Sequence, residues 1–261
     1  MFGLGDRVMP SSFLPEDIAF NIALLLIIVS FFTSALTAAF GLGGGVAMLG
    51  ALAGTAPPSV IIAVHGVVQL GFNTGRAFIQ RQHVLWPATI RFSIGSLIGV
   101  GLGAALFTVL PPRLLLGLIG GFIVAMVWLP KPNIPGLGQS GLLIGGAISS
   151  FLTMFVGATG PFVQALLLPQ KPTRHQLVAT HAMCMTIQHA LKVLAFGFAG
   201  VAFFDWLYLI VLMLISGFVG TMLGTRFLEK MPDQLFRTVL KWTLTIVALD
   251  LLRRAAGVEM I

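Results

Sequence analysis

The sequence predicts an all-α fold, a polytopic bundle of transmembrane helices, from its composition, its long apolar runs and the charges of its loops. Of its 261 residues, 57% are hydrophobic and only 9% are charged, whereas soluble domains carry roughly 25% charged residues. So few charges could not cover a surface exposed to water. The apolar runs are continuous rather than alternating, and this favours helices over a closed barrel as the way to satisfy the backbone in lipid.

Ten apolar segments follow one another along the chain, and we expect each to be a helix. Eight are long enough to cross a bilayer, which takes about 20 residues. The other two, 44–54 and 160–169, are too short to cross alone. Each short segment follows a glycine break, so we expect it to form a broken-helix hairpin with the long helix before it. In chain order the expected helices are 17–40, 44–54, 58–80, 84–109, 112–130, 138–156, 160–169, 173–199, 204–229 and 233–252.

A polar connection around residues 131–139 divides the chain into near-equal halves. We take residues 1–130 as a first transmembrane repeat, 131–139 as the linker loop and 140–261 as a second repeat, all within one integrated membrane domain. A constant offset of 116 residues relates the glycines, histidines and cations of the two halves. The pairs are Gly41 with Gly157, Gly44 with Gly160, His65 with His181, and Arg76 with Lys192.

Equivalent loops of the two halves differ in charge. Residues 76–91 hold three arginines, whereas 199–204 hold no Lys or Arg; residues 169–174 hold two cations, whereas 54–58 hold none. Basic loops mark the cytoplasmic side of a membrane, so equivalent loops lie on opposite sides. This pattern predicts two inverted repeats, a common plan of transporters, and places both termini outside. The net charge of +7 therefore indicates cytoplasmic loops rather than nucleic-acid binding.

The two glycine breaks are the first candidate site. Glycine lets the backbone turn, and each new helix then begins with unpaired N–H groups and a partial positive charge. Two such ends meeting at the bilayer midplane would bind an anion without a buried cation. The alternative interpretation is close packing of helices. The residues concerned are Gly41, Gly43, Gly44 and Gly45 in the first half, and Gly157, Thr159 and Gly160 in the second.

A second constellation lies on the helix after each break. Polar side chains inside a membrane are costly and usually face a bundle interior or an aqueous path. The histidines could bind substrate, carry a proton or only join helices, and the cations could instead snorkel to the interface. No acidic or thiol cluster accompanies the histidines, so we expect no metal. The residues are His65, Gln69, Asn73 and Arg76, then His181, Met185, Gln188, His189 and Lys192.

Several of these motifs resemble the TauE/SafE family of sulfite exporters: FGLGGG at residues 40–45, FVGATGP at 155–161, LVATH at 177–181, and the cation Lys192. The likeness covers about residues 20–250. Members of that family are thought to export sulfite, sulfoacetate and other sulfur-containing or organic anions, so the resemblance implies that the glycine breaks face the substrate. The family often has a proline shortly after the first glycine motif, where this chain has residues 46–49, VAML.

Together these patterns predict a secondary transporter of a small anion in the cell inner membrane that works by alternating access, and the resemblance implies that it exports an anion such as sulfite or sulfoacetate. The breaks would supply N–H donors to the anion. Hydroxyls would come from Thr37, Thr153 and Thr159, and charge from His65, His181, Arg76 and Lys192.

Two alternatives to a carrier remain, namely an anion channel and a membrane-embedded enzyme. No cofactor is expected, and the sequence leaves open whether the chain forms a homodimer.

Overall fold

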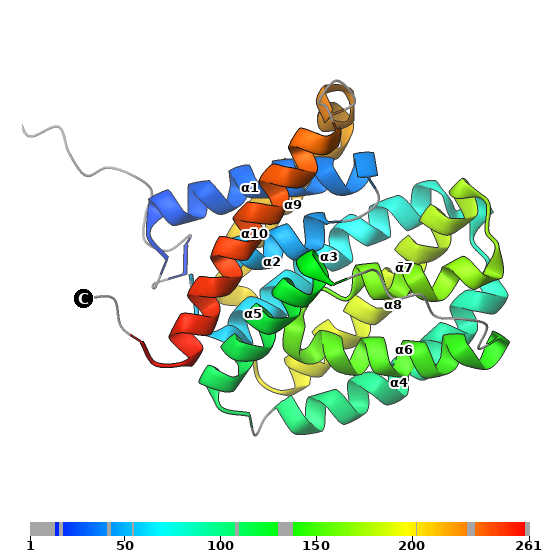
Figure 1. Ribbon diagram of the computed structural model, residues 1–261, viewed down its shortest axis with the longest axis horizontal. Helices are drawn as coiled ribbons and strands as arrows, with labels where there is room; N and C mark the ends of the chain where they lie inside the picture. Colours follow the sequence, from blue (N-terminus) through cyan, green and yellow to red (C-terminus); the bar gives the residue numbers. More distant parts are fainter. Residues whose placement is uncertain are drawn as a thin grey trace, which may run out of the picture.

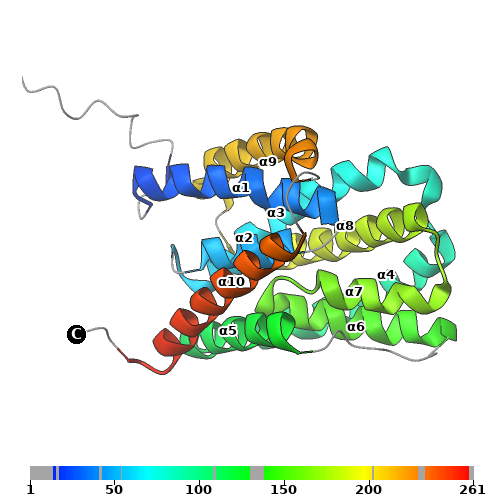
Figure 2. The same ribbon diagram turned by 45° about the horizontal axis from the view of Figure 1, so that its top comes forward.

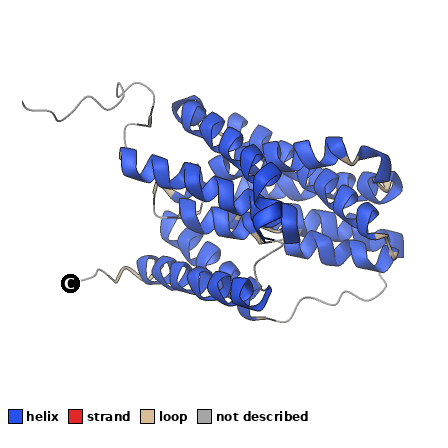
Figure 3. Cartoon of the chain, turned by 90° about the horizontal axis from the view of Figure 1, so that it is seen from above, coloured by secondary structure: helices blue, strands red, loops and turns tan. Residues whose placement is uncertain are grey.

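The computed structural model describes residues 14–15, 18–40, 43–53, 55–107, 110–129, 138–201, 203–228 and 233–258. Their long elements are all helices (Figure 3). As predicted, eight long helices and two short ones follow in order. They are α1 (Phe20–Phe40), α2 (Gly44–Leu52), α3 (Pro58–Ile79), α4 (Trp86–Phe107), α5 (Pro112–Trp128), α6 (Gly138–Val156), α7 (Gly160–Leu167), α8 (Arg174–Phe198), α9 (Leu207–Leu228) and α10 (Asp233–Ala255), with 3₁₀ turns η1 (Arg81–His83), η2 (Leu168–Gln170) and η3 (Phe203–Trp206).

Within the described residues, three segments are both long and apolar enough to cross a membrane: Phe20–Ala38, Trp86–Phe107 and Phe203–Leu223. Two shorter apolar helices, Pro112–Trp128 and Ser140–Val156, accompany them. Helices α3 and α8 have the length, with 22 and 25 residues, but their rows of polar side chains lower their hydropathy. A helix shielded from lipid by its neighbours can carry such residues.

Large apolar side chains cover the outward faces of several helices. Phe32, Leu97, Leu102, Phe218 and Met222 are each about 60% exposed. Soluble proteins rarely expose contiguous apolar surface on this scale, whereas in a bilayer such side chains contact lipid tails. The chain is therefore a multi-pass membrane protein whose exposed apolar surface faces lipid.

The helices pack in layers around a central pair. Helices α3 and α8 lie against each other in the middle of the bundle, with α1 and α9 on one side and α4 and α6 on the other (Figures 1 and 2). The most extensive contacts join α4 to α6 and α1 to α9, and α5 packs on α10. The short helices α2 and α7 pack against α3 and α8 respectively, so both breaks lie beside the central pair.

Glycines of α4 and α9 permit the closest of these helix contacts. A Cβ added at Gly95 or Gly99 would collide with the carbonyl oxygens of Leu143 and Ala147 in α6. Gly220 of α9 lies equally close to a backbone carbonyl of α1. Small residues at such crossings let two backbones approach directly, which is how helices associate strongly in lipid.

We expect Gly99→Leu to lower the melting temperature of the detergent-solubilised protein strongly, because its side chain would push α4 away from α6. Overpacking of this kind costs about 1–3 kcal/mol or more. Gly101→Leu on the same helix is the matched control, since Gly101 is exposed and has nothing within 4 Å of an added Cβ. Equal melting temperatures for the two variants would contradict the packing role of Gly99.

Candidate functional site

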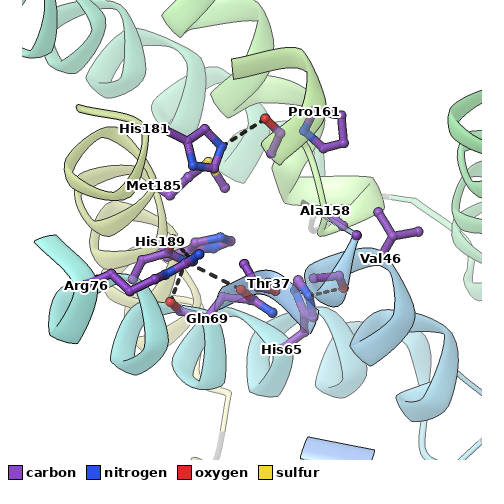
Figure 4. A pocket seen from close by; sticks show the side chains of 14 residues that line it. Thr37, Val46, His65, Gln69, Arg76, Ala158, Pro161, His181, Met185 and His189 are labelled. Atoms are coloured by element: carbon purple, nitrogen blue, oxygen red, sulfur yellow. Dashed lines mark hydrogen bonds between the residues drawn. The ribbon is translucent and has the colours of Figure 1, made fainter. Parts of the chain in front are cut away.

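The two glycine breaks meet at one cavity beside the central helix pair. It holds about 370 Å³ of space not filled by atoms, including the part that opens to solvent. Side chains from α1, α2, α3, α7 and α8 surround it (Figure 4). The lining residues are Thr37, Gly43, Gly45, Val46, His65, Gln69, Asn73, Arg76, Ala158, Gly160, Pro161, His181, Met185 and His189.

The start of α2 supplies backbone donors to this cavity. Gly43 precedes the helix with a φ of 95°, a conformation that residues with a side chain rarely adopt. It has no side chain to cap the helix, and the first N–H groups of α2 have no partner within the helix. Because Gly43, Gly45 and Val46 all line the cavity, this end of α2 presents its partial positive charge there.

The start of α7 differs from the start of α2. Here Gly157 takes the left-handed conformation, with a φ of 79°, and Pro161 occupies the second helical position. Proline has no N–H, and the next N–H, that of Phe162, already bonds to the carbonyl oxygen of Thr159 at 3.0 Å. The two helix starts are therefore not alike, contrary to what the sequence predicts. The start of α2 offers more free backbone N–H donors than the start of α7.

Gly44 and Gly160, the first residues of the two short helices, have different surroundings. A Cβ added to Gly44 would overlap the carbonyl oxygen of Thr33 and Oγ1 of Thr37. A Cβ added to Gly160 would lie 3.6 Å from Nε2 of His181, an ordinary contact. Gly44 thus allows α2 to pack tightly on α1, whereas Gly160 leaves open space in the cavity.

A histidine fastens each short helix to the central helix that follows it. Nε2 of His65 lies 2.9 Å from the carbonyl oxygen of Gly45, and Nε2 of His181 lies 3.0 Å from that of Gly160 (Figure 4). A carbonyl oxygen only accepts hydrogen bonds, so Nε2 of each ring is the nitrogen that donates. The two imidazoles therefore hold the starts of α2 and α7 in equivalent ways.

His189 brings a third imidazole to the cavity. Its ring packs edge-on against that of His65, with centroids 6.0 Å apart. Both side chains are buried, and Nδ1 of each has no hydrogen-bond partner among the described residues. Buried nitrogens without partners are rare in proteins, so Nδ1 of His65 and Nδ1 of His189 are free to interact with a bound ligand or water.

Arg76 is the cation of the cavity, and a chain of hydrogen bonds orients it. Asn73 donates from Nδ2 to the carbonyl oxygen of Gln69 at 2.7 Å and accepts from Nη2 of Arg76 at 2.7 Å. Arg76 lines the cavity, and its hydrogen bond holds the guanidinium beside Asn73, another lining residue. No Asp or Glu belongs to the lining formed by the described residues. The cavity is therefore suited to a negatively charged ligand.

Gln188 holds the second break in place from α8. Its Oε1 accepts from Ser149 at 3.0 Å and from Ser150 at 3.3 Å, and its Nε2 donates to Oγ1 of Thr159 at 2.7 Å. Thr153 donates to the carbonyl oxygen of Gly157 at 3.1 Å. All these side chains are buried. The hydroxyls of Thr153 and Thr159 therefore stabilise the broken helix through contacts within the protein.

The structure brings most of the candidate residues to one place. Of those named from the sequence, the cavity lining includes Thr37, Gly43, Gly45, His65, Arg76, Gly160 and His181. Five others lie outside the lining, namely Gly44, Thr153, Gly157, Thr159 and Lys192. Gly41 falls outside the described residues.

Seven further residues complete the lining: Val46, Gln69, Asn73, Ala158, Pro161, Met185 and His189. Gln69, Asn73, Met185 and His189 belong to the polar constellation named from the sequence, whereas Val46, Ala158 and Pro161 were not named. Steps of four residues place side chains on one helix face, and such steps lead from His65 to Gln69 and Asn73, and from His181 to Met185 and His189.

Comparison with known families decides the identity. The family model described as sulfite exporter TauE/SafE matches residues 26–251, a range that contains both breaks and every lining residue. This chain belongs to the TauE/SafE family. As a TauE/SafE protein it is a membrane transporter and not an enzyme, so the alternative of a membrane-embedded enzyme is excluded. Comparisons of this TauE/SafE chain with curated proteins and with solved structures gave no match.

Proposed function

We propose that this TauE/SafE transporter exports small sulfur-containing or organic anions, such as sulfite or sulfoacetate, by alternating access around the cavity. One observation carries the proposal. The cavity lies where two helices begin, and its described lining has an arginine and three histidines but no carboxylate. Intramembrane cavities with ionisable side chains mark substrate paths. Because the ionisable side chains of this cavity can carry only positive charge, the cavity favours an anion.

The chemistry of an oxyanion matches the groups available. A sulfonate or sulfite oxygen accepts several hydrogen bonds, and the guanidinium of Arg76 can donate two parallel ones to such a group. The first N–H groups of α2 add donors that remain uncharged and need no counterion. His65 and His189 add donors at Nδ1 when protonated. An anion would thus replace its lost hydration with contacts from three helices.

The packing of the helices supports inverted repeats, which alternating access would use. Suppose that α1 to α5 correspond in order to α6 to α10, so that α1 is equivalent to α6 and α4 is equivalent to α9. The contact of α1 with α9 is then equivalent to the contact of α6 with α4. These are the two most extensive helix contacts of the bundle. The pairs of α3 with α8 and of α5 with α10 each join a helix to its own equivalent. Two halves related in this way can rock about a shared central site.

The sidedness follows from where the cations lie. One end of the bundle is marked by the rings of His83 and His175, 5.3 Å apart, which join η1 to the start of α8. Nearby chain segments carry Arg81, Arg91 and Lys171. We infer that this basic end faces the cytoplasm of a cell whose inner membrane holds the protein.

The opposite end has exposed aromatic residues and partly neutralised arginines. Phe198 and Phe204 are 92% and 84% exposed there. Arg253 and Arg254, in the last turn of α10, each form a 2.7 Å ion pair with Asp250. The carboxylate of Asp250 therefore offsets part of their positive charge. Both termini would then lie outside, as an odd number of crossings in each half requires.

Flux measured in proteoliposomes tests the proposal, with sulfite, sulfoacetate, sulfate and acetate offered in turn. We expect saturable uptake of a sulfur-containing anion, acceleration by the same anion on the far side, and a response to an imposed potential worth about 2.3 kcal/mol per charge per 100 mV. Protein-free liposomes give the background. Flux that never saturates and shows no countertransport would indicate a channel. No flux of any of the four anions would refute the proposed substrate class.

A further inference from the structure

Lys192 of α8 is buried without a partner. Its side chain has no exposed surface, and Nζ makes no hydrogen bond among the described residues. The ion pairs found in the described part of the chain involve Asp250, far along the chain on α10. An ammonium in such a place costs several kcal/mol unless it is paired or loses its proton. A stable fold gains nothing from it, so the residue needs a functional explanation.

A glycine on α3 leaves space for the side chain of Lys192. Lys192 packs against Gly66 of α3, where an added Cβ would lie 2.6 Å from Cε of the lysine. Gly66 follows His65, one of the lining histidines. The lysine therefore lies at the interface of α3 and α8, directly behind the wall of the cavity.

One face of α8 leads from the cavity past Lys192 toward the end opposite the basic loops. His189, which lines the cavity, comes three residues before the lysine, and Phe196 comes four residues after it, spacings that share a helix face. Phe196 packs edge-on against Phe107, at 4.8 Å between centroids, and Phe107 contacts Phe155 at 6.2 Å. Phe107, Phe155 and Phe196, here called the aromatic cluster, are all buried. Lys192 lies between the cavity and this cluster.

Arg76 and Lys192 occupy equivalent positions in the two halves, yet only one of them reaches the cavity. Arg76 lies near the cytoplasmic end of α3 and lines the cavity. Lys192 has the equivalent position on α8, which runs in the opposite direction to α3. Its side chain is fully buried. In a carrier with inverted repeats, the conformation that opens to the other side exchanges the surroundings of two such residues.

We propose that Lys192 is a second anion-binding residue, which is exposed only when the transporter opens outward. In the conformation described here, the aromatic cluster separates Lys192 from the outer side of the membrane. The inference rests on the proposed function. The anion first binds at Arg76, passes the contact of His65 with His189, and then pairs with Lys192 before release. The pairing removes the cost of the buried ammonium at the moment when the anion leaves Arg76.

The first test separates binding from transport. Lys192→Met is expected to bind sulfoacetate in detergent within about threefold of wild type, because Lys192 is absent from the open cavity, while its flux falls by roughly tenfold or more. Its melting temperature should equal or exceed that of wild type, since replacing a buried unpaired charge by an apolar side chain often stabilises. Lys192→Arg should retain transport. Leu194→Met, on the lipid-facing side of α8, is the matched control.

Wild-type flux in Lys192→Met would overturn the inference. So would a loss of detergent binding equal to the loss of flux, which would place the lysine in the same site as Arg76. Absence of sulfoacetate transport by the wild-type protein is a different result and would count against the proposed function.

A second test needs no transport and serves if Lys192→Met does not fold. Cys184 is the single cysteine and is buried, so Lys192→Cys in a Cys184→Ala background carries one thiol. A membrane-impermeant thiosulfonate added to the outer face of intact cells should modify it slowly. We expect Phe196→Ala to accelerate that modification by opening the aromatic cluster. Modification from the cytoplasmic face alone, or none from either face, would overturn the exit route.

Discussion

A Gly160→Leu transporter is expected to fold normally and to lose nearly all flux of sulfoacetate. Gly160 has no unusual backbone conformation, and its added Cβ meets only His181 and Met185, at 3.6 Å or more. The remaining leucine atoms would then fill the cavity where the anion should bind. Gly160→Ala adds only one methyl group and should reduce the flux less.

The equivalent change in the first half should act on the fold instead. Gly44→Ala places its Cβ on the backbone of Thr33 and on the hydroxyl of Thr37, a conflict that neither group can relieve cheaply. We expect a loss of about 3 kcal/mol or more in stability, seen as aggregation in size-exclusion chromatography. Melting temperature and flux, measured for both alanine variants in parallel, test the contrast. A stable Gly44→Ala protein, or a Gly160→Leu protein with wild-type flux, would contradict it.

Neutralising Arg76 should produce the second large effect, on substrate affinity. A hydrogen bond to a charged group contributes about 1.5–3 kcal/mol, so Arg76→Gln is expected to raise the KM for sulfoacetate roughly ten- to a hundredfold. Arg76→Lys keeps the charge but loses the two-pronged donor and should give an intermediate KM. The measurement is the dependence of the initial rate of flux on sulfoacetate concentration.

Arg81→Gln is the control for total charge. Arg81 lies near the same end of the protein, but it is exposed and its guanidinium lies 4.7 Å above the ring of Phe78. It contributes nothing to the cavity lining, so its KM should remain that of wild type. Equal increases in KM for Arg76→Gln and Arg81→Gln would mean that the arginines act through the overall field of the basic end and not through contact with the anion.

The glycines show why one kind of residue has several roles here. Gly99 permits contact between two backbones, Gly43 and Gly157 allow positive φ values at the breaks, and Gly160 leaves space in the cavity. A glycine in a sequence carries none of these distinctions, because each depends on what lies opposite the missing side chain. The sequence could therefore indicate the breaks but could not separate their packing glycines from their cavity glycines.

The boundaries of the helices were predictable to within a few residues. The segments expected at 58–80 and 160–169, for example, are Pro58–Ile79 and Gly160–Leu167 in the structure. Continuous apolar runs in a membrane protein favour helices, since a helix satisfies its backbone groups in lipid by bonds within its own segment. Local composition therefore determines this level of structure with little help from tertiary contacts.

The sequence by itself determined the membrane class, the helices, the two breaks and the polar rows that follow them. Only the tertiary structure decided that both breaks meet at one cavity, that Arg76 reaches it, and that Lys192 does not. The physical reason is the geometry of the central pair. Helix spacing tells which side chains share a face, but how α3 and α8 lie against each other decides which part of each face is open and which is buried.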